Sequence, residues 1–508
     1  MPTKKRILFI ILPYYAEYAG TIKSFPTIPY GVLSIAKFIN NYADSRIFDC
    51  HFYNNYLEMI PDEIKDFSPS IIGISMTHDA CFTYLESVVN TIRSYNKNIT
   101  ILLGGSATTY IYKEILNEGI KIDAICYSDG ELPMEDYLRT SKFCKSWVTI
   151  NNITPQKLLL PELDSVIDID YSLIDINKYQ REMITENFSP TTKSKKEIEL
   201  YCMTSRNCCF KCKFCNNSGN PDRKVRYASV DTIINHIESL IQKYGLNVIS
   251  FFDEQILSNT TRAKELFKRL QPYGIRIKIP GGVTPIFIDE EMVDLMWNAG
   301  MDSITIAVES GSKKILKIMR KPTNLNQVRK LMKNLRKYNF FVRVNIVIGM
   351  PEETDDDRKE TIDFIREIRP DLVAPNIASP ILGSVLREEC IKKGYIKDIK
   401  IKPGMYNKSE SVINTEKYSA EHIEEQFKYM IWQLNFVENY RMSIGDFNSA
   451  KDYFQYVTNR YPHEAFAWYY LNKAKEKLGE IQDWTEFNQC LQTNPEWAIR
   501  FKNLGILI

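Results

Sequence analysis

Apolar positions in the first 140 residues fall into short runs separated by amphipathic stretches. The runs "RILFIIL", "SIIGISM", "ITILLGG" and "IDAICYS" are almost wholly apolar, which is typical of strands covered on both faces. Between them, "GVLSIAKFINNYA" and "FTYLESVVNTIRSYN" repeat their apolar residues with a helical period. This alternation predicts a doubly wound, Rossmann-like α/β domain over residues 1–140. Such a domain binds ligands beyond the carboxyl ends of its parallel strands.

A second strand–helix series begins at residue 197. Six further strands are predicted at "EIELYCM", "NVISFFD", "IRIKIPG", "SITIAVE", "VRVNIVIGM" and "LVAPNIAS", with helical stretches between them. This pattern predicts a partial (β/α)6 barrel over residues 197–400, with its reactive groups at the carboxyl ends of the strands. Residues 141–196, which end in the polar "SPTTKSKKE", are expected to form a linker.

Beyond residue 400 the pattern becomes helical. "AKDYFQYVTNRYP" and "EAFAWYYLNKAKEKLG" have helical periodicity, and Pro462 and Pro495 lie 33 residues apart, each followed by a tryptophan. This spacing weakly resembles tetratricopeptide repeats. We expect an α-helical domain over residues 401–508, either as a cap on the barrel or as a peptide-binding surface.

Composition narrows the class of protein. Of 508 residues, 44% are apolar, and the net charge is only +2 with no basic arm, so nucleic acid is not an expected partner. The start, "MPTKKRILFIILPYY", is too short in its apolar run and too bulky after it for a signal peptide, and no run approaches the ~20 residues of a membrane span. The odd total of 11 cysteines argues against a secreted disulfide framework and favours a cytoplasmic location.

Four cysteines lie within eight positions in "TSRNCCFKCKFC". Read as C-x3-C-x2-C, Cys208, Cys212 and Cys215 follow a predicted strand and supply three thiolates. Three thiolates leave one iron of a four-iron cluster open to a substrate amine and carboxylate. Alternatively, Cys209 joins Cys212 and Cys215, and Cys202 or Cys208 completes a closed electron-transfer or zinc site.

The longer stretch "TSRNCCFKCKFCNNSG" resembles the cluster loop of radical S-adenosylmethionine (SAM) enzymes, which often reads T-S-R-G-C-P-F-x-C-x-F-C. Asn207 replaces the glycine and Cys209 replaces the proline, and neither position is a ligand in that family. The resemblance implies that Cys208, Cys212 and Cys215 hold the cluster. It leaves Cys209 as a spare thiol that serves packing.

The resemblance covers most of the chain and implies contacts to SAM. The segments "FFDEQIL", "IAVESGSKKILKIMRK" and "VRVNIVIGMPEETDDD" match family segments that contact SAM. The implied residues are Asp253 and Glu254 at the methionyl amine, Glu309 and Ser310 at a strand end, Gly349 to Glu352 near the adenine, Phe214 packed on the adenine, and Arg343 facing the SAM carboxylate or a surface acid.

Residues 1–140 resemble the cobalamin-binding domain of one branch of this superfamily, through "IPYGVLSIAKFI", "FSPSIIGISMT", "ITILLGGSATT" and "IDAICYSDGELPMEDYL". Gly104 and Gly105 carry no Cβ and let backbone approach a ligand closely. With Gly130 and Glu131, which follow the fourth strand, they are the expected cobalamin-binding residues. Free-standing cobalamin domains often carry the motif D-x-H-x-x-G, whose histidine ligates the cobalt from below. The loop "LPYYAEYAG" of this chain lacks that histidine. We expect cobalamin with no protein imidazole beneath it, with His78 as the nearby alternative ligand.

The resemblance implies a cobalamin-dependent radical SAM enzyme whose cofactors are a 4Fe-4S cluster, SAM and cobalamin. A radical derived from SAM would take hydrogen from a small-molecule or peptide substrate, and methylcobalamin would methylate the unactivated carbon. An electron donor of the flavodoxin or ferredoxin type is expected. The alternatives are a non-methylating rearrangement, cyclisation or oxidation, and a non-catalytic helical-repeat protein that binds a partner.

Overall fold

A six-stranded sheet, ordered β4–β1–β5–β6–β7–β8, forms the centre of the amino-terminal unit. Its first five strands are parallel and β8 is antiparallel, so the order is the flavodoxin-like 2-1-3-4-5 with its switch point between β1 and β5. Helices α2, α3 and α4 pack on one face, and α1 and α5 pack on the other. The predicted doubly wound fold is therefore confirmed.

The elements of this unit are β1 (Lys5–Ile11), β4 (Ala43–Asp49), β5 (Ile71–Ser75), β6 (Thr100–Gly104), β7 (Ala124–Cys126), β8 (Trp147–Val148), α1 (Tyr30–Phe38), α2 (Tyr56–Phe67), α3 (Phe82–Tyr95), α4 (Thr108–Asn117) and α5 (Glu131–Thr140). A separate hairpin, β2 (Tyr15–Tyr18) with β3 (Thr21–Ser24), follows β1. The computed structural model describes residues 4–18, 21–24, 26–127, 129–182, 197–219, 224–396 and 410–508.

Six parallel strands form the second unit as a partial barrel, in the two sheets β13–β12–β9 and β14–β15–β16. Among the residues that the structure describes, one isolated bridge, from Val283 after β13 to Ile306 of β14, connects these sheets. All six predicted strands are present. They are β9 (Glu199–Cys202), β12 (Val248–Phe251), β13 (Arg276–Lys278), β14 (Ser303–Glu309), β15 (Phe341–Ile348) and β16 (Leu372–Ile377).

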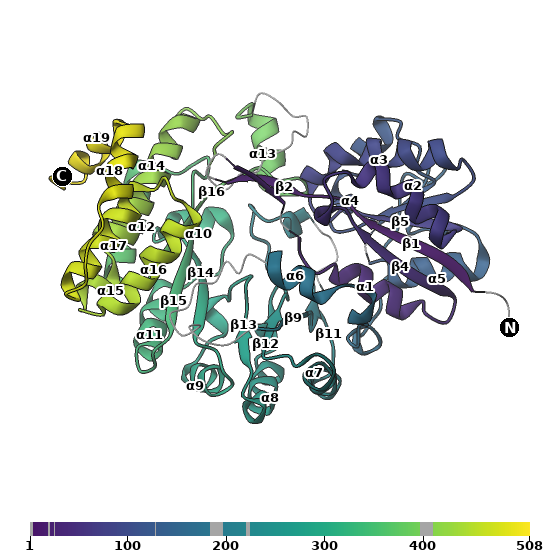
Figure 1. Ribbon diagram of the computed structural model, residues 1–508, viewed down its shortest axis with the longest axis horizontal. Helices are drawn as coiled ribbons and strands as arrows, with labels where there is room; N and C mark the ends of the chain where they lie inside the picture. Colours follow the sequence, from purple (N-terminus) through teal and green to yellow (C-terminus); the bar gives the residue numbers. More distant parts are fainter. Residues whose placement is uncertain are drawn as a thin grey trace.

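The helices outside the barrel include α7 (Val230–Tyr244), α8 (Thr260–Leu270), α9 (Glu290–Asn298), α10 (Lys313–Met319), α11 (Leu325–Leu335), α12 (Asp355–Ile368) and α13 (Val385–Lys393). A short hairpin, β10 (Ser205–Arg206) with β11 (Arg226–Tyr227), branches from the loop after β9. Figure 1 shows the amino-terminal unit beside the barrel, with the carboxyl-terminal helices against the barrel's far side.

The last hundred residues are helical, as predicted for this region. They form α14 (Ala420–Trp432), a π-helical turn η9 (Gln433–Val437), α15 (Tyr440–Ser443), α16 (Phe447–Arg460), α17 (Ala465–Lys477), α18 (Thr485–Thr493) and α19 (Glu496–Asn503). Helix α14 packs into the barrel core, whereas α16 to α19 surround their own aromatic core. In the described ranges no helix combines the length and apolarity of a membrane span.

The Asn435 side chain closes part of the free edge of β16. Its amide oxygen accepts a hydrogen bond from the Val373 N–H at 2.8 Å, and its amide nitrogen donates to the Val373 carbonyl at 2.8 Å. One side chain therefore makes both bonds that a neighbouring strand would make at this residue.

Candidate active site

The cysteine loop begins at the carboxyl end of β9, and a buried carboxylate fixes its start. Asp253 follows β12 and accepts hydrogen bonds from the Thr204 and Ser205 hydroxyls at 2.7 and 2.5 Å, and from the Thr204 N–H at 3.1 Å. Both carboxylate oxygens of Asp253 are thus engaged by the loop. The structure places Asp253 as a brace for the cysteines, and not beside an open position for an amine.

Three thiols of this loop influence one another. Burial, with a smaller contribution from the Cys215 thiolate, raises the pKa of Cys208 to about 11 and that of Cys212 to about 12. Cys212 is buried, Cys208 and Cys215 are partly exposed, and Cys209 is exposed. Because buried thiolates that repel one another need a cationic group between them, these three thiols fit an iron–sulfur cluster. The described residues hold no set of three or more His, Cys, Asp or Glu placed for a single metal ion.

Glu254 lies beside the same thiols. Burial raises its pKa while a hydrogen bond with Asn217 lowers it, and its charge raises the pKa of both Cys208 and Cys215. Its side chain is still reached by solvent. Of the two neighbouring acids predicted to contact SAM, Glu254 is therefore the one with a carboxylate directed to an accessible site.

Glu309 and Lys321 form a buried ion pair next to Cys212. The Lys321 Nζ lies 3.0 Å from the Glu309 Oε1, and both side chains are less than 10% exposed. Lys321 lowers the pKa of Cys212, whereas Glu309 raises it. Glu309 has a left-handed backbone (φ 70°) at a register shift that ends β14, a conformation that costs a non-glycine residue about 1 kcal/mol or more.

Sequence reasoning missed Lys321. A lysine that closes a helical run, as in "KIMRK", reads as a solvated side chain, and only the fold brings it to the cysteines.

Ser310 is fully buried and its hydroxyl is already bonded. It lies 3.1 Å from the Thr361 hydroxyl and accepts from the Ser312 N–H at 3.1 Å. Phe214 packs partly buried against the barrel core. Along the chain, Ser310 follows Glu309 and Phe214 precedes Cys215, so both residues are neighbours of site residues in sequence.

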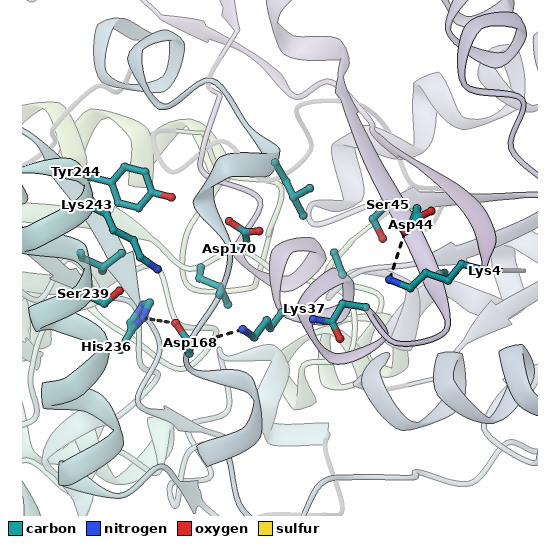
Figure 2. A pocket seen from close by; sticks show the side chains of 16 residues that line it. Lys4, Lys37, Asp44, Ser45, Asp168, Asp170, His236, Ser239, Lys243 and Tyr244 are labelled. Atoms are coloured by element: carbon teal, nitrogen blue, oxygen red, sulfur yellow. Dashed lines mark hydrogen bonds and ion pairs between the residues drawn. The ribbon is translucent and has the colours of Figure 1, made fainter. Parts of the chain in front are cut away.

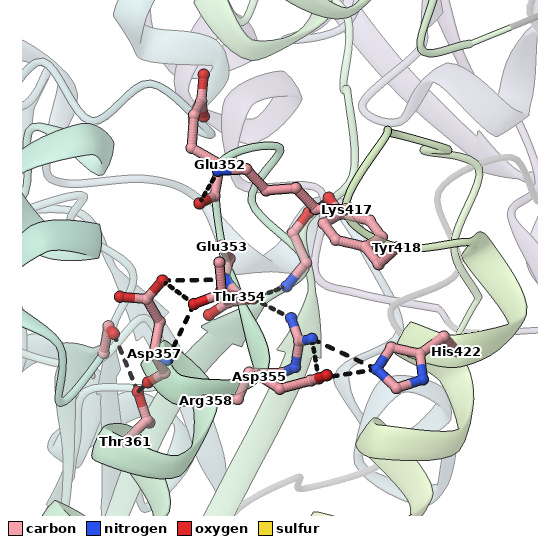
Figure 3. Close-up of polar contacts among 12 residues, drawn as sticks. Glu352, Glu353, Thr354, Asp355, Asp357, Arg358, Thr361, Lys417, Tyr418 and His422 are labelled. Atoms are coloured by element: carbon pink, nitrogen blue, oxygen red, sulfur yellow. Dashed lines mark hydrogen bonds and ion pairs between the residues drawn. The ribbon is translucent and has the colours of Figure 1, made fainter.

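The turn after β15 is fixed from several sides (Figure 3). The Gly349 carbonyl accepts from the Tyr418 hydroxyl, and its N–H donates to the buried Glu353, which also pairs with Arg358. Burial raises the pKa of Glu353 to about 7. Glu352, the residue predicted near the adenine, instead lies 3.1 Å from Lys393 of α13.

Arg343 is not brought to the other predicted residues. It is the third residue of β15, in register with Leu372 at the start of β16, so it lies toward the amino-terminal end of the barrel. Burial raises the pKa of the Tyr453 phenol in α16, and the nearby Arg343 charge opposes part of that rise. The structure therefore places Arg343 against the carboxyl-terminal helices.

At the carboxyl edge of the amino-terminal sheet, Gly105 has φ +109°. A Cβ there would lie 2.3 Å from the Met76 carbonyl oxygen, so glycine is required by packing on the end of β5. Gly104 accepts from the Met76 N–H at 2.8 Å. His78 stands at the same edge, partly exposed, with its Nδ1 accepting from the Ala80 N–H and its ring beside Tyr14.

Glu131 of α5 binds Arg206 of the β10–β11 hairpin, which branches from the barrel. Its carboxylate accepts from Arg206 at 2.7 and 3.2 Å and from the Ser34 hydroxyl at 2.6 Å. Gly130 begins this helix, with the Ile35 side chain filling the space where a Cβ would stand. Ser128, which begins the expected loop of this edge, lies outside the described residues.

A cavity of about 380 Å³ lies at the opposite edge of the same sheet, between α1 and α7 (Figure 2). Lys37, Asp168 and His236 bridge the two units there, with the Lys37 ammonium 3.2 Å and the His236 ring 3.5 Å from the Asp168 carboxylate. Since Lys4 precedes β1 and Ala43 begins β4, this cavity is at the amino-terminal edge, away from the cysteine loop.

Comparison with known families agrees with this geometry. The family model "Radical SAM superfamily" matches residues 203–365, and the model "B12 binding domain" matches residues 24–138. The chain belongs to the B12-binding-domain radical SAM enzymes. Its barrel is the radical SAM domain, its amino-terminal unit is the B12-binding domain, and its cofactors are a 4Fe-4S cluster, SAM and cobalamin.

Relatives of similar length support the assignment. An uncharacterized methyltransferase, PH0819, of Pyrococcus horikoshii is 24% identical over 78% of this chain and 85% of its own. The cytidylyl-2-hydroxyethylphosphonate methyltransferase of Streptomyces wedmorensis is 25% identical over 66% and 68%. The anaerobic magnesium-protoporphyrin IX monomethyl ester cyclase of Rubrivivax gelatinosus is 22% identical over 72% and 66%.

Two solved structures share the fold. The cobalamin-dependent SAM radical enzyme OxsB, with aqua-cobalamin and SAM bound, aligns over 99% of this chain and 80% of its own with a TM-score of 0.69 and 14% identity. The methyltransferase TsrM of Kitasatospora setae, with cobalamin and a [4Fe-4S] cluster, aligns over 79% and 80% with a TM-score of 0.62 and 13% identity.

Proposed function

We propose that this protein is a cobalamin-dependent radical SAM methyltransferase that acts on an unactivated carbon. The observation that carries the proposal is the junction of the two units. The cysteine loop, with its three mutually interacting thiols, is bonded directly to the carboxyl edge of the B12-binding domain. Relatives named as methyltransferases match the chain over most of its length.

When bound, the cofactors supply one-electron cleavage of SAM and a transferable methyl group. The chain's own residues hold and shield these groups. Cys208, Cys212 and Cys215 would hold the cluster, and Glu254 would receive the methionyl amine. The Lys321–Glu309 pair sets the charge beside Cys212.

The B12-binding domain would hold cobalamin at the edge formed by Gly104, Gly105 and the loop before α5. No imidazole is proposed beneath the cobalt, because the loop after β1 offers Pro13, Tyr14 and Tyr15 in place of a histidine. His78 stays the alternative ligand at this edge, with its Nδ1 2.8 Å from the Asp79 carboxylate. Nitrogen hyperfine coupling in the Co(II) electron paramagnetic resonance (EPR) spectrum that disappears in His78→Ala would show this to be wrong.

The substrate is proposed to be a small molecule or a peptide, and the electron donor a flavodoxin or ferredoxin. A structure of TsrM contains a tryptophan substrate, which shows that this fold accommodates a small molecule. The second candidate function is a non-methylating cyclisation, favoured by the similarity to the anaerobic cyclase.

Cysteine variants test the cluster assignment first. After anaerobic reconstitution, Cys208→Ala, Cys212→Ala and Cys215→Ala should each lose the iron and sulfide that the wild type retains. Cys209→Ala is the matched control, since its exposed thiol lies next to the same site, and it should keep the cluster. Loss in Cys209→Ala with retention in Cys208→Ala would reverse the ligand assignment.

Product analysis tests the reaction. With a reductant, the loaded enzyme should convert SAM to 5′-deoxyadenosine. If the reaction is a methylation, S-adenosylhomocysteine should also be released, and the mass of the substrate should increase by one methylene. Release of 5′-deoxyadenosine with a product that gains no carbon would favour cyclisation. Protein with a fully loaded cluster that never cleaves SAM would refute the proposed enzymatic function.

A further inference from the structure

Two arginines of the β10–β11 hairpin are direct cross-strand partners. Arg206 pairs with Arg226, and their side chains are only 13% and 4% exposed. Like charges directly opposite each other repel, and a buried guanidinium without a counter-charge is strongly destabilising. Arg206 lies two residues before Cys208. The entry to the cysteine loop therefore depends on acids supplied from elsewhere.

Those acids come from the B12-binding domain. Asp129 accepts from Arg206 at 2.9 Å and from Arg226 at 2.8 Å, so one carboxylate bridges both guanidinium groups. Glu131 accepts from the two terminal nitrogens of Arg206, at 3.2 and 2.7 Å. Ser34 of α1 donates to Glu131 at 2.6 Å and accepts from Arg206 at 3.1 Å.

The two acids that bind Arg206 lie at the ligand-binding edge of the B12-binding domain. Asp129 and Glu131 lie between β7 and the first turn of α5, at the carboxyl edge where a doubly wound sheet binds its ligand. Bidentate hydrogen bonds between these acids and Arg206 therefore directly link the edge that holds cobalamin to the loop that holds the iron–sulfur cluster.

We propose that Glu131 and Arg206 are positioning residues that couple cobalamin binding to SAM binding. Cobalamin at this edge binds beside Asp129 and Glu131, and their bonds to Arg206 fix the start of the cysteine loop for SAM. Such coupling is reciprocal and falls typically in the range of about 5- to 150-fold in affinity. This coupling acts on binding alone and would operate in a methyltransferase and in a cyclase alike.

The test measures SAM affinity with and without hydroxocobalamin on anaerobically reconstituted protein, from the change that SAM causes in the EPR spectrum of the reduced cluster. In the wild type, cobalamin should tighten SAM binding at least about fivefold. Glu131→Gln should retain iron, sulfide and cobalamin but lose this dependence. Glu135→Gln, one turn further along α5, is the matched control and should retain it.

The reciprocal titration makes the result decisive. Cobalamin affinity, followed by absorbance, should rise with SAM by the same factor in the wild type and not in Glu131→Gln. A wild type whose SAM affinity ignores cobalamin would overturn the proposal. So would a Glu131→Gln variant that keeps the full coupling, because a purely structural Glu131 would alter stability and leave the factor unchanged.

Two milder changes keep the test available if Glu131→Gln does not fold. Arg206→Lys retains the charge but loses the planar fork that spans two acids, and Ser34→Ala removes one partner of the pair. Both should reduce the coupling factor while the cluster content stays intact. Undiminished coupling in both variants would contradict the proposed roles.

Discussion

Two contacts between the B12-binding domain and the rest of the described chain use similar side chains in different environments. At the inner contact, Arg206 and Glu131 are 13% and 2% exposed, and their bonds are bidentate. At the outer contact, Lys37 and Asp168 are 35% and 59% exposed and line a cavity. Both contacts contain an ion pair, so burial decides which of them matters more for folding stability. Exposed ion pairs add little to stability, whereas breaking a buried pair lowers it strongly.

The inner contact also has an apolar part. Leu382 belongs to the core of the B12-binding domain although it follows β16 of the barrel, and the Tyr110 ring of α4 lies against Gly383. The next residues connect to the cysteine loop, since the Val385 and Leu386 N–H groups donate to Ser218 and Lys213.

The largest effect is expected from Glu131→Ala. The change leaves Arg206 with half of its counter-charge in a buried site, so the free energy of unfolding should fall by about 3–5 kcal/mol. Denaturant unfolding followed by fluorescence measures this, with Glu135→Ala on the same helix as control. A loss below about 1 kcal/mol would mean that the inner contact is no stronger than the outer one.

Gly383→Ala should break the apolar part of the inner contact. Its φ is +76°, and an added Cβ would lie 2.3 Å from the Tyr110 ring, so we expect a loss of about 1–3 kcal/mol. Gly394→Ala is the matched control, because its φ of +70° imposes the same backbone strain with no atom within 4 Å. Equal melting temperatures for the two variants would show that the ring contact contributes nothing.

Asp168→Asn should have the smallest effect. The His236 ring, 3.5 Å from the carboxylate, and the Lys37 ammonium beside it hold the pKa of Asp168 well below its usual value. The ionised carboxylate therefore adds stability above a pH of about 4, and this is lost as the pH falls below that value. At neutral pH the substitution should cost less than about 1 kcal/mol, and salt should diminish it. Wild type and variant should converge in acid, and a difference that persists there would point to packing.

The strands were readable from the sequence where both faces are buried. The six barrel strands and the four apolar strands of the B12-binding domain appear as continuous apolar runs. Strand β4 did not, because "ADSRIFD" lies at a sheet edge with its middle residues only partly buried. The cysteine loop was readable because ligand spacing is local along the chain.

Roles that depend on long-range contacts were not readable. Asp253 and Glu254 are neighbours in sequence, yet one braces Thr204 and the other lies beside the thiols, a distinction set by where the strand ends. Arg206 and Glu131 are separated by 75 positions. Nothing local marks either residue as half of a buried pair.

The Asn435 amide has a consequence for solubility during folding and storage. A partial barrel, unlike a closed one, leaves outer strands with unpaired backbone groups, and such edges recruit strands from other molecules. Asn435 occupies both backbone groups of Val373 on β16 without adding a strand of its own. The π-helical turn that carries Asn435 thus blocks part of this edge against strands from other molecules. Chains that lose the Asn435 side chain should aggregate faster than their change in folding stability alone would predict.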